Sequence, residues 1–155
     1  MTTSLLPPRE RLARRWLAAV LVLLLLAPLV ALAQQSSTYT PKPGSREREA
    51  ILDALRPPVQ KALKQKVIFE VQRLKVQNGW AFVMGVPRQP NGKPVDYRKT
   101  AYQAAIKEGM FDDSVLALLR KRSNQWRVVT YALGPTDYPA DGWDKEFKAP
   151  RAIFR

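Results

Sequence analysis

Basic and aromatic side chains alternate along one face of the β-hairpin that residues 67–87 predict. Asn78-Gly79 separates two β-rich runs and favours a type I′ turn, which needs a positive φ angle at both positions. A bulge near Gln72 is an alternative at the outer end. The register puts four residues on one side of the sheet: Arg73, Lys75, Trp80 and Phe82. This face predicts a platform for acidic sugars, lipid head groups or a partner strand. The alternative is that the rings belong to the core and the cationic side chains extend past them.

Carboxylates are the other candidates for chemistry, because the chain contains neither histidine nor cysteine. These absences remove the usual general base, thiolate nucleophiles, disulfides and the usual transition-metal ligands. By the hairpin register, Glu70 shares a face with Leu74 and Val76. The acids considered for proton transfer are Glu70, Asp96 beside Tyr97, Asp112-Asp113, and Asp137 beside Tyr138. Turn formation and solvent-facing ion pairs are the favoured roles for all of them. No residue is therefore assigned as catalytic, and no metal or cofactor is expected.

The first 33 residues have the pattern of a secretory signal peptide. A basic start precedes a leucine-rich run, and Ala31 and Ala33 occupy the −3 and −1 positions before Gln34. We expect an exported protein, periplasmic or secreted, with no stable membrane span after cleavage. The alternative is an inner-membrane anchor, because the 18 residues from Trp16 to Ala33 are at the short end for a span.

The chain that would remain after cleavage is strongly basic. The leader holds four of the 26 basic residues and one of the 13 acidic ones, which leaves 22 against 12 and a net charge of +10. This charge favours anionic neighbours, such as lipid head groups or acidic polysaccharides of the envelope. The cations are spread along the chain in no long run, so nucleic acid is not favoured as a partner. The plain alternative is a well-solvated surface.

A flexible lead is predicted over 34–44, followed by a single domain over 45–155. Ser45 is a candidate N-cap for a helix over about 45–65. Pro57-Pro58 interrupts the apolar pattern of this helix, so we expect it to be kinked or split.

A second hairpin is predicted over 114–134, where two apolar runs flank the polar step Ser123-Asn124. The second run favours a strand because it is rich in β-branched and aromatic residues. The first, over 114–121, is compatible with a strand or a helix. We prefer the hairpin, which places Trp126 beside the basic end of the preceding strand. In the tail, four apolar residues are expected to fasten the chain to the body: Trp143, Phe147, Ile153 and Phe154.

Together these elements predict an α+β fold with the N-terminal helix packed on a curved antiparallel sheet of about four strands. The order of helix, hairpin, loop with a short helix, and hairpin resembles the cystatin-like and NTF2-like folds. The run NQWRVVTYALG is similar to the final strand of many NTF2-like domains, and FDDSVLALLR and GWAFVMGVP resemble segments of small exported bacterial proteins with no assigned activity.

The favoured hypothesis is a small envelope protein without enzymatic activity that binds a partner protein, a second copy or an anionic lipid or polysaccharide through its sheet face. The NTF2-like resemblance implies an alternative, a small-molecule binder or isomerase-type enzyme with a buried carboxylate. The cystatin-like resemblance implies another, an inhibitor or immunity protein of an envelope hydrolase.

Overall fold

The computed structural model describes residues 37–155. The predicted signal peptide and its cleavage positions, Ala31, Ala33 and Gln34, lie outside the described residues. Within residues 37–155, no helix combines the length and the apolar character that a membrane crossing needs.

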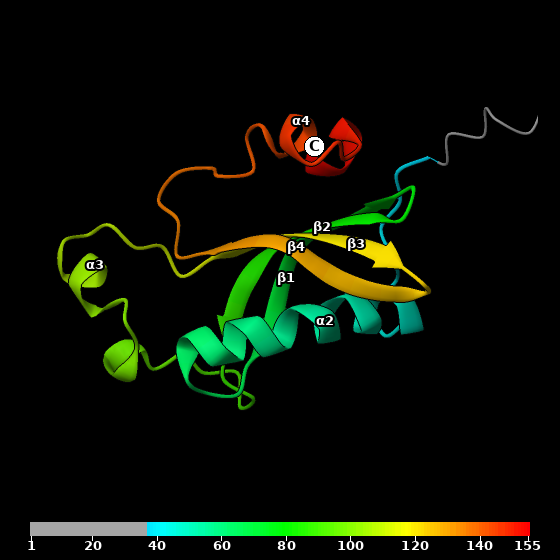
Figure 1. Ribbon diagram of the computed structural model, residues 1–155. Coiled ribbons are helices and arrows are strands. Elements are labelled where there is room, and N and C mark those ends of the chain that lie inside the picture. The colour runs from blue at the N-terminus through cyan, green and yellow to red at the C-terminus, as the bar shows by residue number, and fades with distance from the viewer. Residues whose placement is uncertain (1–36) are drawn as a thin grey trace, which may run out of the picture. The chain divides into compact units, whose positions relative to one another are not determined.

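Four antiparallel strands form one sheet in the order β1-β2-β3-β4, which is also their order in the chain. The strands are β1 (Ile68–Gln77), β2 (Trp80–Arg88), β3 (Val115–Arg122) and β4 (Gln125–Leu133). Helix α2 (Arg46–Leu63) covers one face, and α4 (Trp143–Glu146) with η3 (Arg151–Phe154) lies over the other (Figure 1). Two short elements, η2 (Tyr97–Lys99) and α3 (Gln103–Lys107), lie between the hairpins. The predicted α+β architecture is confirmed.

Helix α2 begins at the predicted cap, where the Ser45 side chain accepts a hydrogen bond from the Arg48 backbone N–H at 3.3 Å. The helix runs through Pro57 and Pro58 without separating into two segments. Residues buried against the sheet recur on both sides of the prolines: Ile51, Leu52, Leu55, Val59 and Leu63. This common packing face outweighs the two backbone hydrogen bonds that the prolines cannot donate.

The first hairpin has the predicted turn and, near it, the predicted register. Asn78 and Gly79 have φ angles of 50° and 71°, and Lys75 pairs with Phe82. Beyond Arg73 the register shifts by one residue at Gln72, so the bulge is confirmed. The shift has a consequence for the outer end of β1, because a one-residue slip exchanges the two faces of a strand.

The bulge corrects the predicted position of Glu70. Phe69 and Val71, its neighbours, pack against the core under α2 together with Leu74 and Val76. Because side chains alternate along a strand, Glu70 lies on the opposite face from Leu74 and Val76, not on the same face.

The second hairpin is confirmed, and residues 115–122 form a strand rather than a helix. Ser123 and Asn124 both have positive φ angles, 48° and 61°, as a type I′ turn requires. The register places Lys121 opposite Trp126, which confirms the predicted position of this tryptophan beside the basic end of the strand.

The sheet is apolar on both faces, and the chain covers both. Under α2 lie Leu74, Val83, Ala117 and Leu119, among others. On the other face, Phe82, Leu116 and Leu118 are covered by a layer that we call the C-terminal layer, residues 138–154. Its buried contacts include Trp143 and Ile153, with Phe147 and Phe154 partly buried beside them. The predicted fastening of the tail is confirmed.

Part of the segment predicted as a flexible lead is paired with the sheet. The backbone of Tyr39 exchanges hydrogen bonds of 3.0 and 2.8 Å with that of Val76 at the open edge of β1. The Tyr39 hydroxyl also donates to Glu47 at 2.8 Å. The chain is therefore attached to β1 a few residues before α2 begins.

Candidate functional site

The four residues of the predicted binding face lie in two different environments. Phe82 is fully buried, with its ring 5.1 Å from that of Phe154. The Arg73 guanidinium donates to the Phe154 carbonyl at 3.0 Å. These two residues are therefore covered by the C-terminal layer. Lys75 and Trp80 lie nearer the turn and are half-buried.

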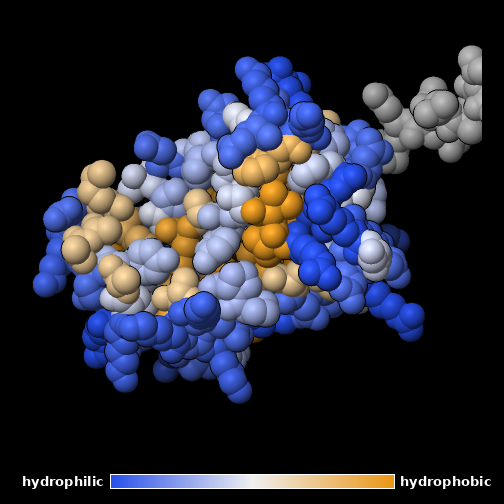
Figure 2. Space-filling view, viewed as in Figure 1, coloured by the Kyte–Doolittle hydropathy of each residue, from blue (hydrophilic) through white to orange (hydrophobic). Residues whose placement is uncertain are grey.

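Trp80 continues across the sheet into a row of basic residues. It pairs with Arg120 on β3, and Arg120 pairs with Arg127 on β4, so the three side chains share one face. Lys75 lies on the same face, one row of side chains closer to the C-terminal layer. Arg122 lies on this face too, one row closer to the turn of the second hairpin. We call this set the cationic strip: Lys75, Trp80, Arg120, Arg122 and Arg127. Figure 2 shows strongly hydrophilic side chains gathered at the hairpin end of this side of the molecule, next to an apolar stripe over β4.

Neutral groups hold the central arginine of the strip in place. The Arg120 guanidinium carbon lies 4.6 Å from the centre of the Trp80 ring, and its Nη1 donates to the Asn78 carbonyl at 2.9 Å. The Arg127 Nη2 donates to the Gln125 side-chain oxygen at 3.3 Å. Both arginines are thus oriented without losing their charge to a carboxylate.

The strip brings like charges together. Arg120 and Arg127 face each other directly across β3 and β4. Within residues 37–155, no carboxylate forms an ion pair with any of the four cations of the strip. Like charges opposite each other on neighbouring strands cost about 0.2–1 kcal/mol. An anion bound between them would remove this cost.

On the opposite face, Lys121 and Trp126 form a second contact between a cation and an aromatic ring. The Lys121 Nζ lies 5.8 Å from the centre of the Trp126 ring. Trp126 is only 7% exposed and belongs to the core under α2. Its role is therefore in packing rather than in recognition.

The acids considered for proton transfer fall into ordinary roles. Glu70 pairs with Arg88 at 2.9 Å. Asp96 accepts two side-chain hydrogen bonds from Arg98, at 2.9 and 2.7 Å, which hold the pKa of this carboxyl well below its usual range. Within residues 37–155, Thr100 is the sole buried polar or charged residue. Proton transfer of the isomerase type needs a buried carboxylate, and this part of the chain contains none.

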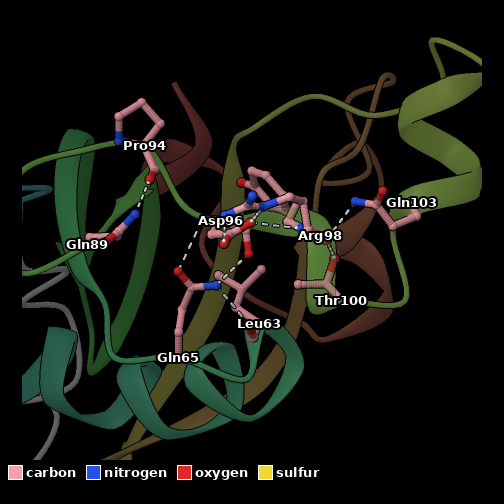
Figure 3. Close-up of polar contacts among 9 residues, drawn as sticks. Leu63, Gln65, Gln89, Pro94, Asp96, Arg98, Thr100 and Gln103 are labelled. Atoms are coloured by element: carbon pink, nitrogen blue, oxygen red, sulfur yellow. Dashed lines mark hydrogen bonds and ion pairs between the residues drawn. The ribbon is translucent and has the colours of Figure 1, made fainter.

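Asp96 also has a structural role. Its backbone is attached to the end of α2 through Gln65, whose side chain donates to the Asp96 carbonyl at 2.8 Å and accepts from the Asp96 N–H at 3.1 Å. Figure 3 shows Gln65 reaching from the end of α2 to the loop that carries Asp96 and Arg98. This arrangement fastens the loop to the helix.

Three other candidate acids lie at the end of the sheet away from the turns. Asp112-Asp113 and Asp137 line a hollow of about 320 Å³, which we call the far-end hollow. Its apolar lining comes from Met84, Val86 and Leu116. Asp113 lies 3.9 Å from the Arg88 guanidinium. All three carboxylates are exposed, and no group of three potential metal ligands occurs in the described part of the chain.

Comparison with protein-family models, with curated proteins and with solved structures finds no match to this chain. The resemblance to cystatin-like and NTF2-like proteins therefore stays a prediction.

Of the residues in the cationic strip, Lys75 and Trp80 were named as candidates from the sequence, but Arg120, Arg122 and Arg127 were not. The register of the second hairpin alone would have paired Arg120 with Arg127. Placing that pair beside Trp80 also requires the pairing of β2 with β3, which joins residues about 40 positions apart.

Proposed function

We propose that this protein is an exported envelope protein that binds polyanionic components of the envelope through the cationic strip and catalyses no reaction. Export is supported by the signal-peptide pattern of residues 1–33. The basic balance of residues 34–155, 22 cations against 12 acids, supports an anionic partner.

One observation carries the proposal: Arg120 and Arg127 stand opposite each other with no carboxylate to neutralise them in residues 37–155. Elsewhere in the chain, several basic side chains have acidic partners, as Arg88 and Arg98 do. An uncompensated pair of like charges lowers stability, and binding sites commonly retain such costs because the ligand needs the charges.

Salt dependence of binding to a sulfated polysaccharide, heparin, tests the proposal. Counterion release gives a slope of about −0.7 to −0.9 in log K against log salt for each neutralised charge on nucleic acids. Four cations on a comparable polyanion therefore give a slope of about −3. The double variant Arg120→Glu/Arg127→Glu is expected to bind at least about tenfold more weakly, because two like charges then meet the ligand.

The matched control is Lys61→Glu/Lys107→Glu. It changes the net charge by the same amount at exposed positions on α2 and α3, away from the strip. This control is expected to retain most of the affinity. An equal loss in both variants would show attraction to net charge alone, and no loss in the strip variant would refute the proposal. Thermal unfolding of each variant, and the milder Arg120→Gln/Arg127→Gln pair, separates lost binding from lost folding.

A further inference from the structure

We infer that the ligand of the cationic strip is an unbranched acidic polysaccharide, one chain of which lies across the strands from β1 to β4. This inference rests on the proposed function and narrows it from polyanions in general to one class. It follows from the length of the strip, the wall beside it, the covered aromatic faces and the predominance of arginine.

The strip is longer than a single small anion. Its cations come from β1, β3 and β4, and neighbouring strands are about 4.8 Å apart, so the strip extends about 14 Å. One phosphate or carboxylate group reaches a single pair of these cations. A ligand that engages Lys75 and Arg127 together must carry several acidic groups in a row.

The C-terminal layer forms a wall along one side of the strip. Phe154 packs on Phe82, which pairs directly with Lys75 across β1 and β2, and Trp80 packs against the same cluster. Figure 1 shows α4 and the C-terminal turn standing on this face of the sheet, beside the hairpin end. A helical layer is about 10 Å thick. A lipid bilayer is flat on this scale and would meet the wall before Lys75, whereas a single polymer chain can lie at the foot of the wall.

The aromatic rings in and beside the strip, Trp80 and Phe82, do not present open faces to nucleobases. Proteins that bind single-stranded nucleic acids stack successive bases on open aromatic faces. Here the Arg120 guanidinium covers a face of the Trp80 ring, and Phe82 is fully buried. A polyanion without bases fits this surface better than a nucleic acid does.

Arginine supplies three of the four cations of the strip. The planar guanidinium forms paired hydrogen bonds with carboxylate, sulfate or phosphate groups, which a lysine ammonium cannot do. Because Trp80 and the Asn78 carbonyl already orient Arg120, less side-chain freedom is lost when a ligand binds. These features suit acidic groups held at intervals on a sugar chain.

Fluorescence anisotropy with labelled oligogalacturonates of increasing length tests the inference on the purified protein. The monomer is expected to bind too weakly to detect. Affinity should rise at least about tenfold with chain length, since each added ion pair contributes on the order of 1.4 kcal/mol or less, and then level off once the chain spans the strip. Arg120→Gln/Arg127→Gln should abolish this gain with length.

Two comparison ligands are measured at equal concentration of charge: vesicles of phosphatidylcholine with phosphatidylglycerol, and a single-stranded oligonucleotide. Weaker binding of both supports the inference. Tighter binding of the vesicles overturns it and leaves the proposed function standing. Tighter binding of the oligonucleotide overturns both, because nucleic acid is not an envelope component. If the oligogalacturonates, the vesicles and heparin all fail to bind at low salt, the proposed function itself is wrong.

Discussion

The two ends of the sheet differ in whether their arginines have acidic partners. At the far end, Arg88 lies between two acids, Glu70 at 2.9 Å and Asp113 at 3.9 Å. At the turn end, Arg120 and Arg127 face each other, and no carboxylate in residues 37–155 pairs with them. The far end thus forms ion pairs within the described chain, whereas the facing arginines at the turn end have no acidic partner in residues 37–155.

The two ends also differ in the backbone. The far end contains the Gln72 bulge, and Gly85 lies opposite it, paired with Val71. A Cβ atom at Gly85 would come within 2.5 Å of the Glu70 carbonyl oxygen. At the turn end, Gly79 has space for a Cβ atom but has a positive φ angle of 71°. Glycine is therefore needed for close approach at one end and for conformation at the other.

The largest expected change in stability is the loss caused by replacing Gly85, which should exceed the loss caused by replacing Gly79. Gly85→Ala should lower the free energy of unfolding by about 1–3 kcal/mol or more, because the backbone of β1 must move away. Gly79→Ala should cost about 1–2 kcal/mol, from the left-handed conformation alone. Urea denaturation measures both. An equal or smaller loss for Gly85→Ala would show that the strands at the far end separate easily.

A smaller effect is expected at Tyr97, whose phenol is influenced by the far-end acids. Burial, and next the charge of Asp113, raise the pKa of Tyr97 to about 12. Its hydroxyl is buried without a hydrogen-bond partner in the described residues. Tyr97→Phe should therefore raise the free energy of unfolding by about 1 kcal/mol at neutral pH.

The same tyrosine gives a pH dependence with a definite sign. Between pH 10 and 12 the unfolded chain loses the phenolic proton first, so the stability of the native protein falls as the pH rises through this window. Tyr97→Phe should reduce that fall. Part of the loss of stability will remain because of Tyr39. Burial and the hydrogen bond to Glu47 also raise the pKa of Tyr39 to about 12. Unfolding curves at pH 9 to 12 are the measurement, and identical slopes in both proteins would contradict it.

The smallest expected changes in stability come from replacing one arginine at each end of the sheet, Arg127 at the turn end and Arg88 at the far end. Arg127→Gln should stabilise the fold by about 0.2–1 kcal/mol, since it removes a like-charge pair, and weaken polyanion binding. Arg88→Gln should destabilise it by up to about 1 kcal/mol and leave binding unchanged, because it breaks exposed ion pairs at the far end. If the melting temperatures of the two variants shift in the same direction, the proposed difference in charge pairing between the two ends of the sheet is wrong.

Local sequence signals predicted most of the fold. Asn78-Gly79 and Ser123-Asn124 mark turns that need positive φ angles, and this backbone chemistry acts within a few residues. Pro57-Pro58 does not by itself decide whether the helix continues, because that depends on how α2 packs against the sheet. The face that Glu70 occupies depends on a bulge that the sequence permits but does not require.

The composition of the cationic strip was predicted only in part, for a related reason. Arg73 and Phe82 have the same local pattern as Lys75 and Trp80, and only the fold of the distant tail decides which pair is covered. Arg120 joins Trp80 through strand pairing between hairpins. A single sequence carries little information about contacts of this range.

The C-terminal layer also bears on the time course of biosynthesis. Phe82 is made some seventy residues before Ile153, the fully buried residue of the layer that covers its side of the sheet. Until the C-terminal layer has been made and packs on the sheet, Phe82, Leu116 and Leu118 remain uncovered in the nascent chain. Exposed apolar surface of this kind promotes aggregation and is bound by chaperones. The order of the chain therefore leaves this face of the sheet uncovered until residues 138–154 have been made.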